Sequence, residues 1–402
     1  MDKSNKPKTD AAAPAKKSRV VPTLLRQMNV RRVLDALRRL GEVSRADLTR
    51  VTGISAPTMS KLVEELANSG LIEADPEMRY ATGRPSVMYR MATRSAQILG
   101  AVIGMRECTV LATGLDGELD ERRTHTFATP DSYDAFLVTL AAELTAIHKL
   151  VKAPCLGVGL SLPGLIKATA GEMVLSPNIH FLDGRCPGTD LAKLLKLPVV
   201  AVQEEHALCL AERMFGAARG VEHFAMLDIS DGLGMGVISG GRLIAGSDGF
   251  GGEIGHMTAK RGGELCGCGN RGCLETVATD LAFTRALARR TGQTLSMDEI
   301  ISAVQSGQLV IEPEINDVLD YLAIGIGTVI NVFNPAMLFV YGRLFAVRDG
   351  LFDALVRRVG EHALKPSLQR CKIVRAQGNK RLGAIAAIIS SHVNTLGPLL
   401  PA

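Results

Sequence analysis

The pattern of hydrophobic and polar residues divides the chain into three parts. Residues 1–21 are rich in Lys, Ala and Pro and contain no apolar run, which predicts a disordered basic tail. Residues 22–95 show helical periodicity followed by two short strand-like stretches, and residues 96–402 alternate short apolar runs with helical stretches. We therefore expect a small N-terminal domain and a larger α/β body.

The small domain has the pattern of a helix-turn-helix. Apolar residues recur at helical spacing from Leu24 to Leu40, just before a glycine. Two shorter segments, RADLTRVT and APTMSKLVEELANS, each follow a serine that can cap a helix and precede a glycine that can end one. A long helix before two short helices joined by a glycine turn is typical of this motif. We expect a small side chain at a helix crossing, Ala46, and a core of Leu48, Val51, Ile54, Met59, Leu62, Val63 and Leu66.

The next segment, LIEADPEMRYATGRPSVMYRM, predicts two strands around a turn, the wing of a winged helix-turn-helix. Residues 1–95 hold 18 Lys and Arg against 10 Asp and Glu, whereas the remainder holds 28 against 31. This asymmetry favours DNA binding by the small domain over a structural or protein-binding role. The candidate DNA contacts lie at the start of the third helix and at the tip of the wing: Ser55, Ala56, Thr58, Ser60, Lys61 and Arg84.

The body has the pattern of two lobes around a cleft. Strands are expected in ILGAVIG, CTVLATGLDGEL, CLGVGLSLPGLI, PVVAV and FAMLDISDGLGMGVISGGRLIAG, and helices near 132–150, 189–196, 205–217, 278–291, 315–333 and 381–393. Such a cleft is the usual place for a small ligand.

Cysteine usage and hydropathy indicate the compartment. Five of the eight cysteines are scattered singly, which argues against a disulfide framework and for a reducing cytoplasm. No uninterrupted apolar run approaches the roughly 20 residues that span a bilayer, and the N-terminus has no secretion signal. We expect a cytoplasmic protein without membrane insertion that associates with the nucleoid when bound to DNA.

The other three cysteines lie together in CGCGNRGC, ten residues after a histidine. One His and three Cys form the donor set that structural Zn²⁺ prefers, so we expect zinc bound by His256, Cys266, Cys268 and Cys273. A redox pair is the alternative, but C-x-C with a third cysteine five residues later fits it poorly.

Several segments give the body a specific resemblance. GGEIGHM, CGCGNRGCLE and DGLGMGVISGGRLIAGSDG, together with GLSLPGLI, LSPNIHF, AERMFGAARG and VINVFNPAMLFVYG, resemble the ROK family of repressors, open reading frames and sugar kinases over residues 96–395. The resemblance implies a two-lobed, actin-like ATPase fold. The winged N-terminal domain is similar to that of the family's repressors, which its kinases lack.

The resemblance also implies a sugar site. Glu253, His256 and Glu275 match the family's residues that bind sugar hydroxyls, and Asn178 matches another sugar contact. Glu204 aligns with the kinase base, an Asp, and is expected to bind sugar without catalysing. Zinc on one ring nitrogen of His256 would leave the other free to face the sugar.

The phosphate-binding motifs depart from the kinase pattern. Val102, Met105 and Arg106 replace the Asp, second Gly and Thr of the first phosphate turn, and Asp231 occupies the second. A Met side chain and an added carboxylate both oppose the approach of phosphates. We therefore expect no enzymatic activity, but a sugar-responsive regulator, most simply a repressor of carbohydrate genes that binds operator DNA as a homodimer or homotetramer. The alternatives are a bifunctional or residual sugar kinase, and control by a phosphotransferase-system protein.

Overall fold

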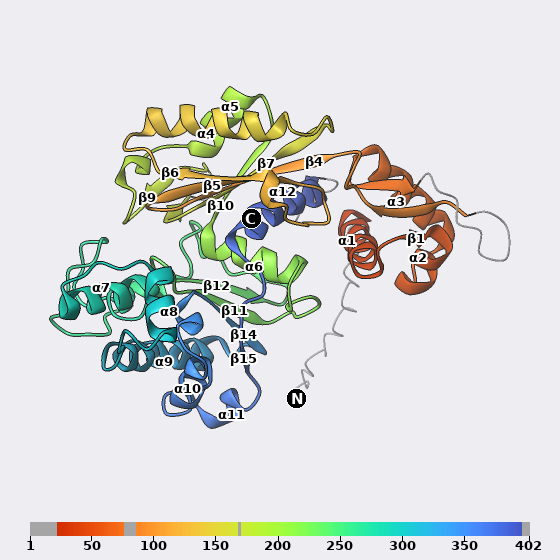
Figure 1. The fold of residues 1–402 in the computed structure, drawn as a ribbon. Helices are drawn as coiled ribbons and strands as arrows, with labels where there is room; N and C mark the ends of the chain where they lie inside the picture. The colour runs from red at the N-terminus through yellow and green to blue at the C-terminus, as the bar shows by residue number, and fades with distance from the viewer. Residues whose placement is uncertain (1–21, 76–85, 168–169, 396–402) are drawn as a thin grey trace, which may run out of the picture.

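The computed structural model describes residues 22–75, 86–167 and 170–395, and places an N-terminal domain beside a body of two lobes (Figure 1). The N-terminal domain contains α1 (Pro22–Leu40), β1 (Val43–Ser44), α2 (Arg45–Thr52), α3 (Ala56–Asn68), β2 (Ile72–Asp75) and β3 (Met88–Met91). Its strands form a sheet in the order β1-β3-β2. The winged helix-turn-helix prediction is confirmed, and Arg84 lies outside the described residues.

Local capping defines the helices of this domain. The Ser44 side chain accepts a hydrogen bond from the Asp47 backbone N–H, and Gly53 ends α2 with a φ of 69°. Ser55 precedes α3, but its hydroxyl bonds Thr58 instead of capping the helix. Two expectations were wrong, because Ala46 and Val51 are exposed: α2 buries only a narrow face, on which Leu48 lies.

The first lobe is built on a five-stranded sheet in the order β10-β7-β4-β5-β6. Helices α4 and α5 cover one face, and α12 covers the other (Figure 1). Gly159 allows the closest approach, because a Cβ there would lie 1.7 Å from the Ala384 carbonyl oxygen of α12. The elements are β4 (Gln97–Ile103), β5 (Glu107–Thr113), β6 (Thr124–Ala128), α4 (Tyr133–His148), β7 (Cys155–Leu162), β8 (Leu165–Ile166), β9 (Met173–Leu175), α5 (Pro187–Leu195), β10 (Val199–Gln203) and α12 (Lys380–Thr395).

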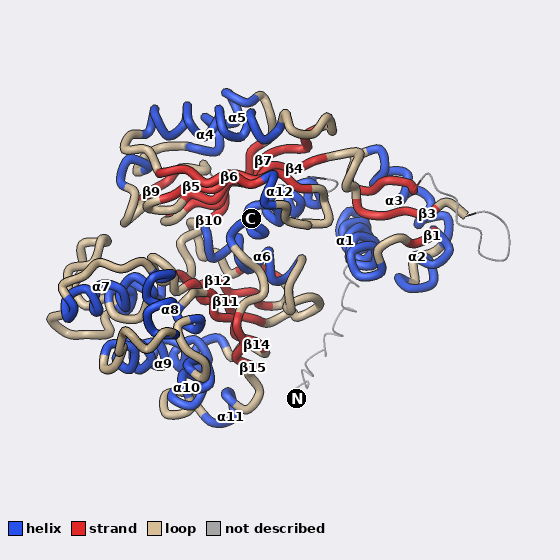
Figure 2. Tube along the Cα trace, viewed as in Figure 1, coloured by secondary structure: helices blue, strands red, loops and turns tan. Residues whose placement is uncertain are grey.

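The second lobe contains a sheet in the order β13-β12-β11-β14-β15, with its helices packed on one side (Figure 2). Its elements are β11 (Phe224–Asp228), β12 (Gly234–Ser239), β13 (Arg242–Leu243), α7 (Asp280–Thr291), α8 (Met297–Gln305), α9 (Glu314–Phe333), β14 (Met337–Tyr341), α10 (Leu351–Val359), α11 (Lys365–Leu368) and β15 (Lys372–Arg375). Helix α6 (Glu204–Met214) lies between the two sheets and contacts α12, β11 and β12. The α/β prediction is confirmed, although the sequence analysis did not foresee α8, α10, α11, β6, β9, β14 and β15.

Helix α9 is long and apolar enough to cross a membrane, but most of its apolar stretch is buried in the core of the second lobe.

Helix α12 helps to join the N-terminal domain to the body. Its Ile385, Ile388 and Ile389 share one hydrophobic core with Leu71 and Ala92 of the N-terminal domain. The winged domain is therefore packed on the body through a core to which α12, Ile98 of β4 and Leu111 of β5 all contribute.

Candidate functional site

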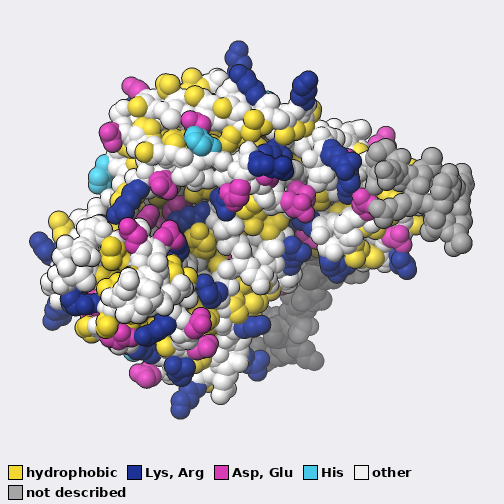
Figure 3. All heavy atoms as spheres, viewed as in Figure 1, with side chains coloured by type: hydrophobic (Ala, Val, Ile, Leu, Met, Phe, Trp, Pro, Cys, Tyr) yellow, Lys and Arg dark blue, Asp and Glu magenta, His cyan; other side chains and the backbone are white. Residues whose placement is uncertain are grey.

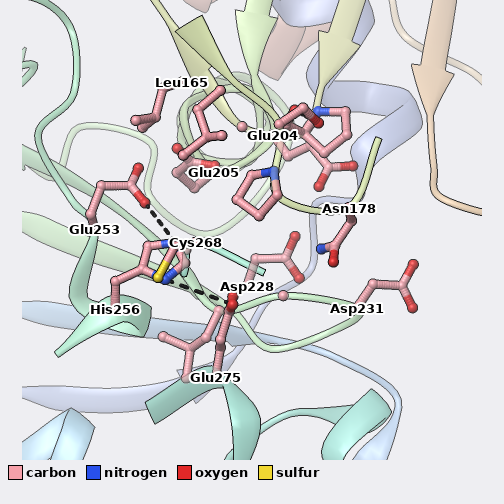
Figure 4. A pocket seen from close by; sticks show the side chains of 18 of the residues that line it. Leu165, Asn178, Glu204, Glu205, Asp228, Asp231, Glu253, His256, Cys268 and Glu275 are labelled. Atoms are coloured by element: carbon pink, nitrogen blue, oxygen red, sulfur yellow. Dashed lines mark hydrogen bonds and ion pairs between the residues drawn. The ribbon is translucent and has the colours of Figure 1, made fainter. Parts of the chain in front are cut away.

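A cavity of about 330 Å³ opens between the two lobes, near the lower end of the size range of small-molecule sites. The first lobe contributes loops at 104–105, 163–165 and 175–178, and α6 contributes its first turn. The second lobe contributes loops at 231–234, 253–256 and 268–275. All five expected sugar-binding residues line this cavity: Asn178, Glu204, Glu253, His256 and Glu275 (Figure 4).

The histidine and the three clustered cysteines converge at one edge of the cavity. The ligand atoms of His256, Cys266, Cys268 and Cys273 all lie within 4.8 Å of one another. The Cys266 Sγ lies 3.6 Å from His256 Nδ1, and the Cys268 and Cys273 sulfurs are 3.7 Å apart. A tetrahedral zinc with bonds of about 2.0–2.3 Å separates its ligand atoms by about 3.5–3.8 Å, so the cluster fits such an ion. The cluster can hold a metal ion.

The backbone of this loop brings the cysteines together. Cys266 N–H donates to the Asn270 carbonyl at 2.8 Å, and Cys273 forms a β-bridge with Thr258. Gly272 has a φ of 73°, and a Cβ there would lie 1.8 Å from the Lys260 carbonyl oxygen, so glycine is required. The loop also reaches across the cavity, because a Cβ on Gly267 would lie 2.7 Å from the Pro177 carbonyl oxygen.

The two ring nitrogens of His256 face different partners. Nδ1 faces Cys266 and lies 3.7 Å from Glu275 Oε1, whereas Nε2 lies 3.6 Å from Glu253 Oε2 (Figure 4). Burial raises the pKa of Glu253, the charge of His256 opposes this, and the charge of Glu275 adds to it. Carboxylates on both sides of a fixed imidazole can accept hydrogen bonds from neighbouring sugar hydroxyls.

A buried ammonium group that the sequence analysis missed lies behind the cavity and pairs with two of its lining residues. Lys380, the first residue of α12, places its Nζ 3.0 Å from Glu204 Oε2, 2.9 Å from Asp228 Oδ2 and 3.0 Å from Ser230 Oγ. Burial alone would lower the pKa of Lys380, but the charges of Asp228 and Glu204 raise it well above its usual value. Burial raises the pKa of Glu204 to about 7, although Lys380 opposes this shift. Lys380 thus ties the second lobe to α12.

The turns at Gly104 and Ser230, which the resemblance aligned with phosphate loops, each contain an internal hydrogen bond. Asp228 Oδ1 accepts from the Ser230 backbone N–H at 3.0 Å and from its hydroxyl at 2.6 Å. Gly104 N–H donates to the Glu107 carbonyl at 3.0 Å, and Met105 lines the cavity. The backbone N–H groups of Gly104 and Ser230 are therefore already used and do not point to a ligand.

The N-terminal domain presents its candidate DNA contacts to solvent. The exposed residues at the start of α3 include all the described candidates, Ser55, Ala56, Thr58, Ser60 and Lys61, whereas Met59, Leu62 and Val63 of this helix are buried. Acidic and basic side chains are interspersed over the face of the body drawn in Figure 3. The start of α3 is therefore free to enter a groove.

Two family models match the two parts of the chain that the structure shows, the body and the N-terminal domain. The ROK family model matches residues 98–392, and the MarR family model matches residues 27–79. The chain is 28% identical over 317 residues to the xylose repressor of Bacillus subtilis, covering 78% of this chain and 81% of that protein. It is 25% identical over 384 residues to the Escherichia coli DNA-binding transcriptional dual regulator NagC, covering 92% and 94%.

Some of the similar solved structures cover nearly the whole chain, and others cover about three quarters of it. A ROK family transcriptional regulator, described as a homologue of the E. coli MLC protein, superposes with a TM-score of 0.76 at 25% identity and covers 92% of this chain and 98% of its own. A ROK glucokinase from Streptomyces griseus, in complex with glucose and AMPPNP, has a TM-score of 0.64 at 22% identity and covers 73% and 98%. That likeness shows the fold of the body alone. The family model spans most of the chain, which therefore belongs to the ROK family.

Proposed function

We propose that this protein is a cytoplasmic, sugar-responsive repressor of carbohydrate uptake or metabolism genes. Relatives named xylose repressor and N-acetylglucosamine repressor each align over 92% of this chain, which takes in parts of both the winged domain and the body. The single observation that carries the proposal is the position of α12. This helix begins with Lys380, which pairs with the cavity-lining Asp228, and its Ile385 and Ile389 pack against the core of the N-terminal domain.

In the proposed mechanism, a sugar enters the cavity between the lobes. Glu253 and Glu275 accept hydrogen bonds from hydroxyls, His256 presents Nε2, and Asn178 contacts the sugar from the first lobe. Contacts from both lobes stabilise one angle between them. Because Lys380 ties Asp228 of the second lobe to α12, a change of that angle moves α12 and with it the winged domain.

The four-ligand cluster is proposed to hold a structural zinc through His256 Nδ1 and the three cysteine sulfurs. The ion would fix the ring orientation of His256 and the loop that carries Glu275. Ser55, Ala56, Thr58, Ser60, Lys61 and Arg84 are proposed to contact DNA, and a homodimer or homotetramer would place two winged domains on successive major grooves. Kinase activity is disfavoured for two reasons. The Ser230 N–H already donates to Asp228, and the carboxylate of Glu204, which aligns with the kinase base, is paired with the ammonium of Lys380.

The test is fluorescence anisotropy of the purified protein on DNA from upstream of its own gene, at fixed salt and without ATP. We expect selective binding that one member of a panel of hexoses, hexosamines and pentoses releases. Selective binding that no sugar changes would refute sugar sensing and direct the search to a phosphotransferase-system protein. ATP turnover with any hexose would refute the non-enzymatic assignment.

A further inference from the structure

The cavity is more acidic than the binding of a neutral sugar requires. Among the described residues that line it there is no Lys or Arg, and six are carboxylic acids: Glu204, Glu205, Asp228, Asp231, Glu253 and Glu275. Lys380 lies behind the cavity and pairs with two of them, Glu204 and Asp228. The remaining four face the cavity without a Lys or Arg partner among the described residues.

Glu205 differs from the other three because it is buried and has no assigned role. It is the second residue of α6 and only 7% exposed, whereas Asp231 is exposed and Glu253 and Glu275 adjoin His256. Its Oε1 accepts from the Gln203 amide at 3.2 Å, and its own backbone N–H also donates to the carboxylate. Both donors are neutral.

Such a carboxyl group favours a cationic partner. Burial raises the pKa of Glu205 well above its usual value, and the nearby charges of Glu253 and Glu204 raise it further. An uncompensated carboxylate in a buried site is costly, whereas an ammonium group at hydrogen-bonding distance offsets that cost. The hydroxyl of a neutral sugar provides a hydrogen bond but no charge.

We propose that Glu205 makes the cavity selective for an amino sugar with a free, protonated amine. This inference rests on the proposed function, because it names the class of effector for the same site. The ammonium would form a charge-assisted hydrogen bond with the Glu205 carboxylate, while hydroxyls of the ring meet Glu253, His256 and Glu275. An N-acetylated amine lacks the charge and cannot make this pair.

The test is isothermal titration calorimetry of the full-length protein at about pH 6.5, where amino groups are protonated. Glucosamine, mannosamine and galactosamine are each compared with the parent hexose and with the N-acetyl derivative. We expect at least one amino sugar to bind more than about tenfold more tightly than both of its neutral counterparts. Glu205→Gln should bring that ratio to within about twofold of one. Glu172→Gln, the same change in the turn between β8 and β9 and outside the cavity, should leave the ratio unchanged.

The outcomes separate this inference from the proposed function. If neutral sugars bind and their amino forms bind no more tightly, selectivity for the amine is refuted and sugar sensing stands. If wild type prefers an amino sugar and Glu205→Gln keeps the preference, Glu205 is not the selective residue. If no sugar binds a protein that still binds its operator, both proposals fail. Thermal unfolding of Glu205→Gln and of a second variant, Glu205→Ala, distinguishes lost selectivity from lost folding.

Discussion

Replacing Glu73 by glutamine should loosen the joint between the winged domain and the body. Glu73 lies on β2 with a side chain only 9% exposed, and it accepts hydrogen bonds from Arg90 Nε at 2.8 Å and from Ser95 Oγ at 2.6 Å. The backbone N–H groups of Arg94 and Ser95 donate to it at 3.2 and 2.8 Å. One carboxylate thus holds the segment that leads from β3 into β4.

The magnitude follows from the pKa of Glu73. Burial alone would raise this pKa, but the hydrogen bonds from Ser95, Arg90 and Arg94 lower it from the ordinary 4.5 to about 2. A carboxyl group with that difference between folded and unfolded states contributes about 3 kcal/mol of stability. Because the folded pKa is the lower one, this contribution is present above pH 4.5 and is lost as the pH falls toward 2.

The assay is native-state hydrogen exchange of α2 and α3 in the wild type and in Glu73→Gln. At pH 7 the opening free energy of the variant should be lower by about 3 kcal/mol, and near pH 3 the difference should shrink to about half. Asp120→Asn, which alters a half-exposed carboxylate paired with Arg122 and outside the joint, should leave the exchange of α2 and α3 unchanged. A difference that is independent of pH, or absent at pH 7, would refute the reasoning.

Three further changes test other parts of the structure. Metal analysis by plasma mass spectrometry should find one zinc per chain. The zinc should be lost in Cys273→Ser and retained in the control Cys155→Ser, because Cys155 lies outside the cluster; equal zinc content in the two variants would contradict the proposed ligands. Lys380→Met should lower the free energy of unfolding at pH 7 by about 3–5 kcal/mol in denaturant titrations, because Glu204 and Asp228 lose their cation. Adding Glu204→Gln should restore part of the loss, and an unchanged midpoint for Lys380→Met would refute the pairing. Gly159→Ala should lower the free energy of unfolding by at least about 3 kcal/mol in thermal unfolding, because the added methyl overlaps the Ala384 carbonyl. The control is Gly188→Ala, where the added methyl comes 3.1 Å from Ala201 Cβ. If Gly159→Ala had no larger effect than this control, α12 would pack less closely than described.

The sequence predicts those parts of the fold that depend on local rules. Ser44 and Gly53 mark the ends of α2 by capping and by a positive φ, and both interactions involve neighbours a few residues away. The exposure of Val51 could not be foreseen in this way, because the periodicity of an eight-residue helix does not show which side meets α1 and α3. Strand β15 was also missed, because it is short, half-exposed and paired in parallel only through β14.

The candidate site divides in the same manner. His256 and the cysteines are close in sequence and carry a recognisable donor set, so a motif identifies them. Lys380 meets Glu204 only because α12 returns to the first lobe at the end of the chain, and no local pattern reports that contact. A lysine followed closely by the apolar run LGAIAAII was the one available signal, since a charged residue beside a buried helix face needs a partner.

The central claim is that a sugar bound between the lobes changes the affinity of the winged domain for DNA. The most direct measurement is the operator dissociation constant by fluorescence anisotropy, at fixed salt, with and without a saturating sugar whose binding calorimetry has established. We predict an affinity at least about tenfold weaker with the sugar, a coupling of about 1.4 kcal/mol, and loss of this effect in Glu253→Gln. Equal operator affinities in the presence and absence of a bound sugar would contradict the account.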